Sequence, residues 1–145
     1  MKKKIIFGVV IAVVVLGLLI QLIPLPGRGH NPAVVQEPKW DSPQTRALVK
    51  RACFDCHSNE TVWPWYSRIA PVSWLVTFDT VRGRSRLNFS EWGVARGGER
   101  GEGDGAEQIQ RGSMPPAIYL TLHPAASLTT AEKQQLIDGL RASGR

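Results

Sequence analysis

The sequence predicts an all-α protein in which one membrane-length helix precedes a single small helical domain. Three observations lead to this prediction. The chain has 145 residues, 43% of them apolar, which suits one domain with a core but not several domains. It begins with a continuous apolar run, and the remainder shows helical spacing and helix caps. No stretch shows the alternating apolar and polar pattern of a strand, so no sheet is expected.

The apolar run, residues 5–23, is the first predicted helix. It contains no charge and only one polar side chain, Gln21. At about 1.5 Å per residue it spans roughly 28 Å, close to the hydrocarbon thickness of a bilayer. Three lysines precede it, and positive charge favours the cytoplasmic side. We therefore expect residues 1–4 in the cytoplasm, a single-pass anchor in the inner (cytoplasmic) membrane at 5–23, and the remainder in the periplasm.

A cleaved signal peptide is the alternative reading of this run. Its apolar part would be shorter, about 7 to 15 residues, and a small-residue cleavage site would follow it. Here the run is longer and leads into bulky and proline residues at 22–26. The pattern favours an uncleaved anchor.

Residues 24–40 are predicted to be a linker, and residues 41–145 the folded domain. The linker contains four prolines and no sustained periodicity, which is typical of an extended tether. Ser42 and Pro43 form a good N-cap and first-turn pair for a helix that runs into the cysteines.

The rest of the domain is predicted as three helical segments and a loop. A helix over residues 72–82 is expected to bury Trp74, Leu75, Phe78 and Val81. Residues 93–105, rich in glycine, are expected to be a flexible surface loop, followed by a short helical turn at 106–111. The last helix has the clearest signal, because Thr129 and Glu132 form a capping box before a stripe of Leu136, Ile137 and Leu140.

The charge balance argues against nucleic-acid binding. The chain has 18 basic and 12 acidic residues, and three of the basic residues precede the apolar run, so little excess remains for the domain. The dense basic stretch Arg82, Arg84 and Arg86 is most simply a solvated face. Haem propionates or an acidic partner are the alternatives for this cluster.

Residues 53–57 carry the strongest chemical signal. Cys53-Phe54-Asp55-Cys56-His57 is a CxxCH sequence, the attachment pattern for c-type haem. Two thiols separated by two residues on one turn can form thioethers with the two vinyl groups of a porphyrin, and the next histidine is then held beneath the iron. Cys53 and Cys56 are therefore predicted to attach haem c covalently, and His57 to ligate its iron.

Two other readings of the cysteines are weaker. A thioredoxin-like redox pair also uses CxxC, but it needs a βαβ context with strands. A zinc site needs four ligands, and only His30, His57 and His123 are available to join the two thiols.

Met114 is the predicted second axial ligand. It is the only methionine after the first residue, and it lies in a proline-braced segment where a thioether can approach iron. A core methionine is the ordinary alternative, and His123 is the other candidate ligand. For the second ring nitrogen of His57, the sequence suggests the carbonyl of Pro71 as acceptor.

The motifs between Cys53 and Trp92 resemble those of a known family. The stretch contains CxDCHSN, WPWYS, APVSWL and LNFSEW, and resembles the bacterial membrane-anchored haem-binding domain proteins related to cytochrome c. The resemblance covers about 100 residues and implies a small cytochrome c-like helical domain around a covalent haem. The sequence departs from the family pattern at 97–105, where a more helical, less glycine-rich segment is usual.

The function predicted from these residues is electron transfer rather than catalysis. A six-coordinate monohaem protein needs no catalytic acid, base or nucleophile, and no such arrangement is recognisable in the sequence. We expect no enzyme activity, a redox partner protein in the periplasm, and the inner membrane as the partner of the apolar helix. The alternative is a haem-based sensor in which a small ligand displaces Met114; an assembly factor is a third possibility.

Overall fold

The computed structural model describes residues 2–94 and 101–143, with the backbone alone at 101–104. The chain divides into two compact units. The first unit comprises residues 1–30 and 63–78, and the second unit comprises residues 31–62 and 79–145. Within the described residues the secondary structure is helical, apart from one isolated bridge between Gln36 and Glu91. The predicted all-α class is confirmed.

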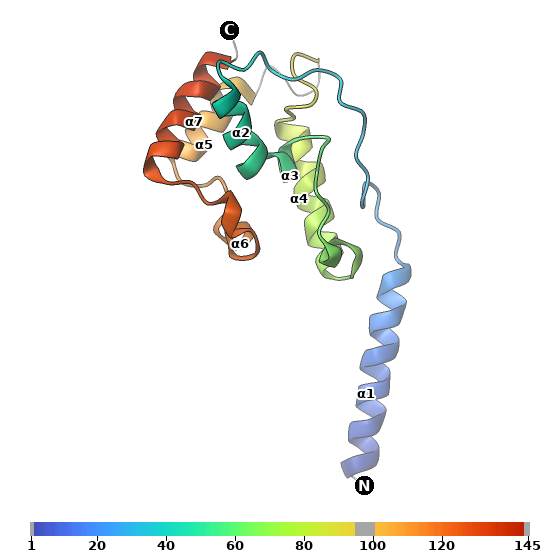
Figure 1. Cartoon of the computed structure of the whole chain (residues 1–145). Coiled ribbons are helices and arrows are strands. Elements are labelled where there is room, and N and C mark those ends of the chain that lie inside the picture. The colour runs from blue at the N-terminus through green and yellow to red at the C-terminus, as the bar shows by residue number, and fades with distance from the viewer. Residues whose placement is uncertain (1, 95–100, 144–145) are drawn as a thin grey trace. The chain divides into compact units, whose positions relative to one another are not determined.

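The first unit contains the apolar helix and an aromatic loop. Helix α1, Lys2–Leu19 (Figure 1), continues as the 3-10 turn η1, Ile20–Leu22. None of the side chains of α1 and η1 is buried. By length and composition the helix Lys2–Leu22 could cross a membrane. The loop contains the 3-10 turn η2, Trp65–Arg68, and leads into α4, Val72–Arg86, whose second half belongs to the second unit.

The second unit is built on packed helices. α2 packs against α7, and α5 packs against α7 as well (Figure 1). The buried apolar side chains of this unit form one hydrophobic cluster, which includes Leu136 of α7, Phe54 of α3 and Phe89 after α4. The remaining elements of this unit are α2 Pro43–Ala52, α3 Phe54–His57, α5 Gly101–Gln110, α6 Ala117–Leu122, η3 Pro124–Ala126 and α7 Thr130–Ser143.

The contact between α2 and α7 depends on a glycine. A Cβ atom added to Gly139 would overlap the side chain of Thr45, which is itself only 1% exposed. Only the smallest residue lets the two helices approach so closely at this point. The first and last helices of the second unit are thereby joined.

Both predicted helix caps are confirmed. The Ser42 hydroxyl accepts a hydrogen bond from the Thr45 amide at 3.2 Å, and Pro43 occupies the first position of α2. At α7, the Glu132 amide donates to the Thr129 hydroxyl, and the Thr129 amide donates to the Glu132 carboxylate at 2.8 Å. These local interactions satisfy backbone groups that a helix start leaves unpaired.

The predicted buried face of α4 is wrong. The helix begins at Val72 as expected and extends to Arg86, but Leu75, Phe78 and Val81 are exposed at 54%, 56% and 47%. The buried positions are small and polar: Ser73, Thr77, Thr80 and Gly83. Small residues let a helix backbone approach its neighbour closely, and this packing prevails over the apolar stripe read from the sequence.

The predicted loop at 93–105 is partly wrong. α5 begins at Gly101, while residues 95–100 lie outside the described part of the chain. Ala106 and Ile109 are buried against the core at 1% and 5% exposure. Packing against α7 stabilises this helix despite the low helix propensity of its glycines.

Part of the predicted linker is attached to the second unit. Residues 31–40 are largely extended, as the prolines suggest, but Val35 and Gln36 both donate backbone hydrogen bonds to the Ser90 carbonyl. Trp40 packs against the core, with its ring 5.6 Å from that of Phe89. The backbone pairing shows that the second half of this segment is fixed on the second unit rather than loose.

Candidate functional site

The cysteines lie on a short turn that continues from α2. Cys53 ends α2, with its amide donating to the Val49 carbonyl at 2.8 Å, and it also begins α3. The His57 amide returns to the Cys53 carbonyl at 2.9 Å. Phe54 is 2% exposed and stacks on Phe89, so it fixes the turn to the core. Cys53, Cys56 and His57 are thereby left half-buried on one turn.

The His57 ring is oriented by a backbone carbonyl. Its Nδ1 atom lies 3.1 Å from the Leu87 carbonyl oxygen, and the Phe89 amide donates to the His57 carbonyl at 2.8 Å. The acceptor is therefore Leu87, and the prediction of Pro71 is wrong; the Pro71 carbonyl accepts from the Trp74 amide. With Nδ1 on a carbonyl, Nε2 is the nitrogen left for a metal.

Burial also sets the protonation of this imidazole. It lowers the pKa of His57, and the hydrogen bonds to the carbonyls of Leu87 and Gly83 oppose this effect only in part. A lowered pKa favours the neutral ring at neutral pH. Neutral imidazole is the form that ligates metals.

A buried polar network supports the segment after His57. The Asn88 side-chain amide donates to Asn59 Oδ1 at 2.9 Å, and the Asn59 amide groups bond Ser90, Ala33 and Glu91. Asn59, Asn88 and Ser90 are at most 3% exposed. Residues 58–60 and 87–92 are therefore joined by paired polar groups, which are costly to break when buried.

Arg84 reinforces the same segment. Its Nε donates to the Ser58 carbonyl at 2.7 Å, and its Nη2 donates to Thr61 and Asn31 at 2.8 Å each. Arg84 is half-buried, whereas Arg82 and Arg86 are exposed. Arg82 and Arg86 therefore lie on a solvated face, as expected. Arg84 instead has a structural role, through its hydrogen bonds.

α4 approaches the cysteine turn through Gly83. A Cβ atom built on Gly83 would overlap the Cys56 carbonyl oxygen and lie 3.2 Å from the Cys56 Cβ. The helix backbone therefore packs directly on the turn that holds the second thiol. A side chain at position 83 would displace one or the other.

The two thiols are not activated as a redox pair would be. Burial raises the pKa of Cys53 to about 12. It raises that of Cys56 to about 11, with the carboxylates of Asp79 and Asp55 adding to the effect. Thioredoxin-like cysteines have lowered pKa values, so the chemistry of these thiols differs from that of a dithiol oxidoreductase. The two cysteines are not joined to each other by a disulfide.

The zinc alternative also lacks support in the described residues. Across 2–94 and 101–143, no group of three or more His, Cys, Asp or Glu side chains is placed to hold a metal ion. A structural zinc site needs four ligands.

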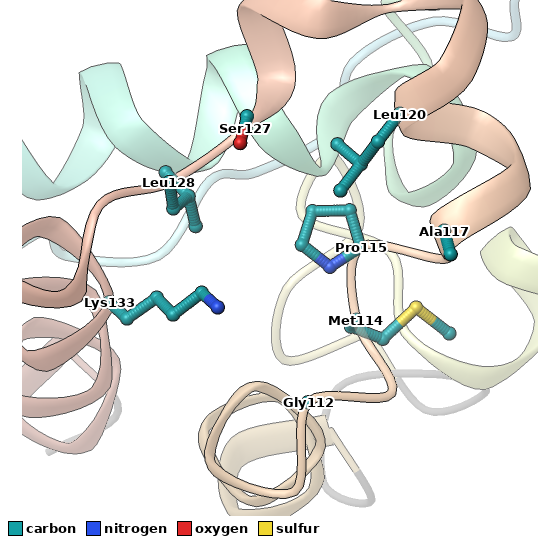
Figure 2. A pocket seen from close by; sticks show the side chains of 8 residues that line it. All are labelled: Gly112, Met114, Pro115, Ala117, Leu120, Ser127, Leu128 and Lys133. Atoms are coloured by element: carbon teal, nitrogen blue, oxygen red, sulfur yellow. The ribbon is translucent and has the colours of Figure 1, made fainter.

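Met114 lies on the same core as the cysteine turn. Met114 and Cys53 are both partly buried and packed against the hydrophobic cluster. Beside Met114 is a cavity of about 150 Å³, lined also by Pro115, Leu120 and Lys133. Figure 2 shows the Lys133 side chain extending from α7 toward the segment of Met114, and the Met114 thioether pointing away from Lys133. The cavity is smaller than the roughly 300 Å³ of typical ligand pockets, so it is not a porphyrin site.

One hydrogen bond joins the methionine segment to the cysteine turn. The Tyr119 hydroxyl, on α6, donates to Asp55 Oδ2 at 2.7 Å. Asp55 lies between the two cysteines, and its Oδ1 accepts from the Val62 amide at 3.0 Å. The His123 ring stacks on Tyr119 with centroids 4.1 Å apart, and its Nδ1 faces the Tyr119 carbonyl. The structure thus connects α3 and α6 through side chains.

Sequence reasoning identified the thiols, His57 and Met114, but not their supports. Leu87, the Asn59–Asn88 pair and the Asp55–Tyr119 bond were not predicted. The segments CHSN and LNFSEW, which carry the family resemblance, could have indicated these supports, since the structure packs one segment against the other. The roles of Cys53 and Cys56 in haem attachment stay predictions, as do the ligand roles of His57, Met114 and His123.

Comparison of the sequence with models of protein families identifies the family of this chain. The sequence model for the haem-binding domain matches residues 15–142, nearly the whole chain. The chain belongs to the haem-binding domain family. It is therefore a haem-binding protein, and the expected resemblance is confirmed. Searches of curated proteins and of solved structures gave no match.

The residues of this haem-binding domain suit the cofactor. Two thiols two residues apart lie on one turn, and Gly83 provides backbone where a side chain would fill the space beside Cys56. The Nδ1 atom of the His57 imidazole is hydrogen-bonded to the Leu87 carbonyl. On α6, the exposed side chains Ile118 and Leu122, one turn apart, offer apolar surface of the kind a porphyrin covers.

Proposed function

We propose that this haem-binding protein is a membrane-anchored monohaem c-type cytochrome that transfers single electrons. The observation that carries the proposal is the CxxCH turn, in which His57 Nδ1 is held by the Leu87 carbonyl and Nε2 is left for iron. Cys53 and Cys56 would attach the haem, and His57 and Met114 would be the axial ligands. The haem supplies the one-electron redox chemistry when bound.

The chain's own residues position and protect such a group. The Leu87 carbonyl fixes the ring plane of His57 and raises its basicity as a ligand. Gly83 and Phe54 hold the thiol turn against α4 and the core. Asp55 is already bonded to Tyr119 and Val62, which suits a structural role better than catalysis. We therefore propose no enzyme activity.

Met114 is preferred to His123 as the second ligand. Met114 packs with Cys53 against the same hydrophobic cluster, whereas the His123 ring is stacked on Tyr119 with the ring centroids 4.1 Å apart. Methionine ligation raises the reduction potential relative to bis-histidine ligation, which suits an electron carrier.

The proposed location is the inner membrane, with the haem domain in the periplasm. The helix Lys2–Leu22 is long and apolar enough to span a bilayer, and its lysines stand at the N-terminal end. The positive-inside tendency supports a cytoplasmic N-terminus.

A haem-based sensor is the second candidate, and one observation favours it. A cavity of about 150 Å³ lies beside the segment that carries Met114, the proposed ligand. A labile thioether would let a small ligand reach the sixth position of the iron.

The attachment is tested first, on the full-length protein made in cells that mature c-type cytochromes. A pyridine haemochrome spectrum of the thioether type and haem that resists acid-solvent extraction are expected. Cys53→Ala with Cys56→Ala should release all haem to the solvent. Haem that still resists extraction from the double variant would overturn covalent attachment.

The ligand set and the choice between functions are tested by the ferric spectrum. A far-red sulfur-to-iron band that disappears in Met114→Ala but persists in His123→Ala supports the cytochrome. High-spin ferric iron in the unmodified protein would favour the sensor instead.

A further inference from the structure

The first unit presents an exposed apolar surface around η2 and the start of α4. Trp65, Ile69 and Val72 are exposed at 76%, 47% and 43%. Trp65 is the most exposed of the five tryptophans in the chain. A large aromatic side chain is seldom left in water at this level, and a contiguous apolar surface of this kind usually marks a contact with a partner or a membrane.

The surface is continuous with the end of the membrane-length helix. The side-chain amide of Gln21 makes two hydrogen bonds with Ala70: the Ala70 amide donates to Oε1 at 2.9 Å, and Nε2 donates to the Ala70 carbonyl at 3.2 Å. Gln21 lies in the last turn of the helix Lys2–Leu22, so residues 65–72 are held where the apolar span ends. An unpaired amide would be costly at that depth, and this pairing satisfies it.

The charge of the first unit matches an anionic lipid surface. Residues 1–30 and 63–78 contain none of the 12 acidic residues of the chain. Arg28 and Arg68 are the cations beyond the C-terminal end of the helix, and both are exposed. Arginine at this level can extend its head group to lipid phosphates while its stem stays in apolar surroundings.

We propose that the loop from Trp65 to Val72 rests in the headgroup and acyl boundary of the bilayer that α1 crosses. Trp65 and Tyr66 would form an aromatic anchor of the kind found at membrane interfaces, and Arg68 would meet the phosphates. This inference rests on the membrane anchor of the proposed function. It adds a second membrane contact, from a part of the chain that follows the haem-attachment turn in sequence.

The test uses the full-length protein in vesicles of phosphatidylethanolamine and phosphatidylglycerol. A photoreactive benzoylphenylalanine replaces Trp65, and lipid adducts are measured by mass spectrometry. Two further single replacements serve as references: Leu16, in the middle of α1, and Gln135, on the exposed face of α7. Leu16 reports the anchor itself, and Gln135 reports indiscriminate labelling.

Lipid adducts at positions 16 and 65, with little at 135, are the expected result. Lipid adducts at position 16 without lipid adducts at position 65 would overturn the interfacial contact but leave the anchor intact. Adducts between position 65 and a protein would have the same meaning. No adduct at 16 would overturn the anchor, and the inference with it. Equal adducts at all three positions would also overturn the inference, because labelling would then be unselective.

A second variant tests the link through Gln21. Gln21→Ala removes both hydrogen bonds to Ala70 and should lower the adduct yield at position 65 by about fivefold, with the yield at position 16 unchanged. Leu22→Ala is the matched control, since it shortens the neighbouring exposed side chain without touching Ala70. Equal yields in the two variants would overturn the role of Gln21.

Discussion

His57 and Met114, the two proposed ligands, are held by different kinds of structure. His57 has its ring on the Leu87 carbonyl, its own carbonyl on the Phe89 amide, and a buried Asn59–Asn88 pair beside it. Met114 is partly buried beside a cavity of about 150 Å³, and its segment reaches the cysteine turn through the Tyr119 hydroxyl. The His57 side is therefore held by several hydrogen bonds, whereas the Met114 side lies next to unfilled space.

The strongest test of this contrast is Gly83→Ala. The new methyl group would overlap the Cys56 carbonyl, so the turn or α4 must move. We expect the free energy of unfolding to fall by about 3 kcal/mol, the upper part of the range for overpacking, and the haem content to fall with it. Urea denaturation followed by circular dichroism, with a pyridine haemochrome assay, measures both.

Ser85→Ala, an exposed position on the same helix, is the control and should change stability by less than about 0.5 kcal/mol. If Gly83→Ala kept full haem content and normal unfolding, the His57 side would not be rigid.

Asn88→Ala tests the buried network on the His57 side. It leaves the Asn59 side-chain oxygen Oδ1 and the Ser90 backbone amide without their partner, at positions only 3% and 0% exposed. A loss of about 2 kcal/mol in the free energy of unfolding is expected. Gln134→Ala, which removes an exposed amide from α7, should have almost no effect in the same urea titration. Equal losses would mean that the network adds nothing beyond a surface hydrogen bond.

Tyr119→Phe tests the Met114 side and should act mainly on ligand exchange. It removes the hydrogen bond to Asp55 while leaving the ring stacked on His123. Such a bond to a carboxylate contributes about 1.5 kcal/mol, so imidazole should bind the ferric protein about tenfold more tightly as Met114 is displaced more readily. Spectroscopic titration measures the affinity.

Thr121→Ala removes a hydroxyl from α6 that bonds only within the helix, and it should leave the imidazole affinity unchanged. An unchanged affinity in Tyr119→Phe would show that Met114 is fixed by other contacts.

The smallest predicted effect is the loss of a salt bridge in acid, and this salt bridge involves α2, the helix that leads to the cysteines. Arg46 bonds the Glu37 carboxylate at 2.6 and 2.7 Å, and this bonding holds the pKa of Glu37 below its usual 4.5. The unfolded chain therefore binds this proton more readily. The stabilisation of the fold by this pair is therefore complete above about pH 4.5, and it is lost as the pH falls through the lowered pKa of Glu37.

Glu37→Gln should consequently cost less than about 1 kcal/mol at neutral pH, because the pair is partly exposed, and less still near pH 3. Denaturation at the two pH values measures the difference. Glu107→Gln, whose partner is one turn away on an exposed face of α5, serves as the comparison. A cost that persists in acid would mean that Glu37 acts by packing rather than by charge.

Local signals in the sequence were sufficient for part of the fold. The caps at Ser42 and Thr129 are recognisable because each is decided by residues three positions apart, and the structure has both. The CxxCH turn is similarly local, since Cys53 to His57 lie in five consecutive residues. The membrane-length helix follows from composition alone.

Long-range packing accounts for what the sequence did not predict. The inner face of α4 is chosen by how closely Gly83 approaches Cys56, and no periodicity within α4 contains that information. α5 forms in a glycine-rich stretch because α7 covers Ala106 and Ile109. The acceptor for His57 comes from Leu87, a residue brought near only after the CHSN and LNFSEW segments pair.

The contact of Thr45 with Gly139 has a consequence for the order of assembly. α2 precedes the two thiols and α7 follows them, so the contact between these helices cannot form until the chain has been made through position 139. During that interval α2, the helix that leads into the thiol turn, has no α7 to pack against. A chain that ends before position 139 would leave the buried face of α2 without this partner.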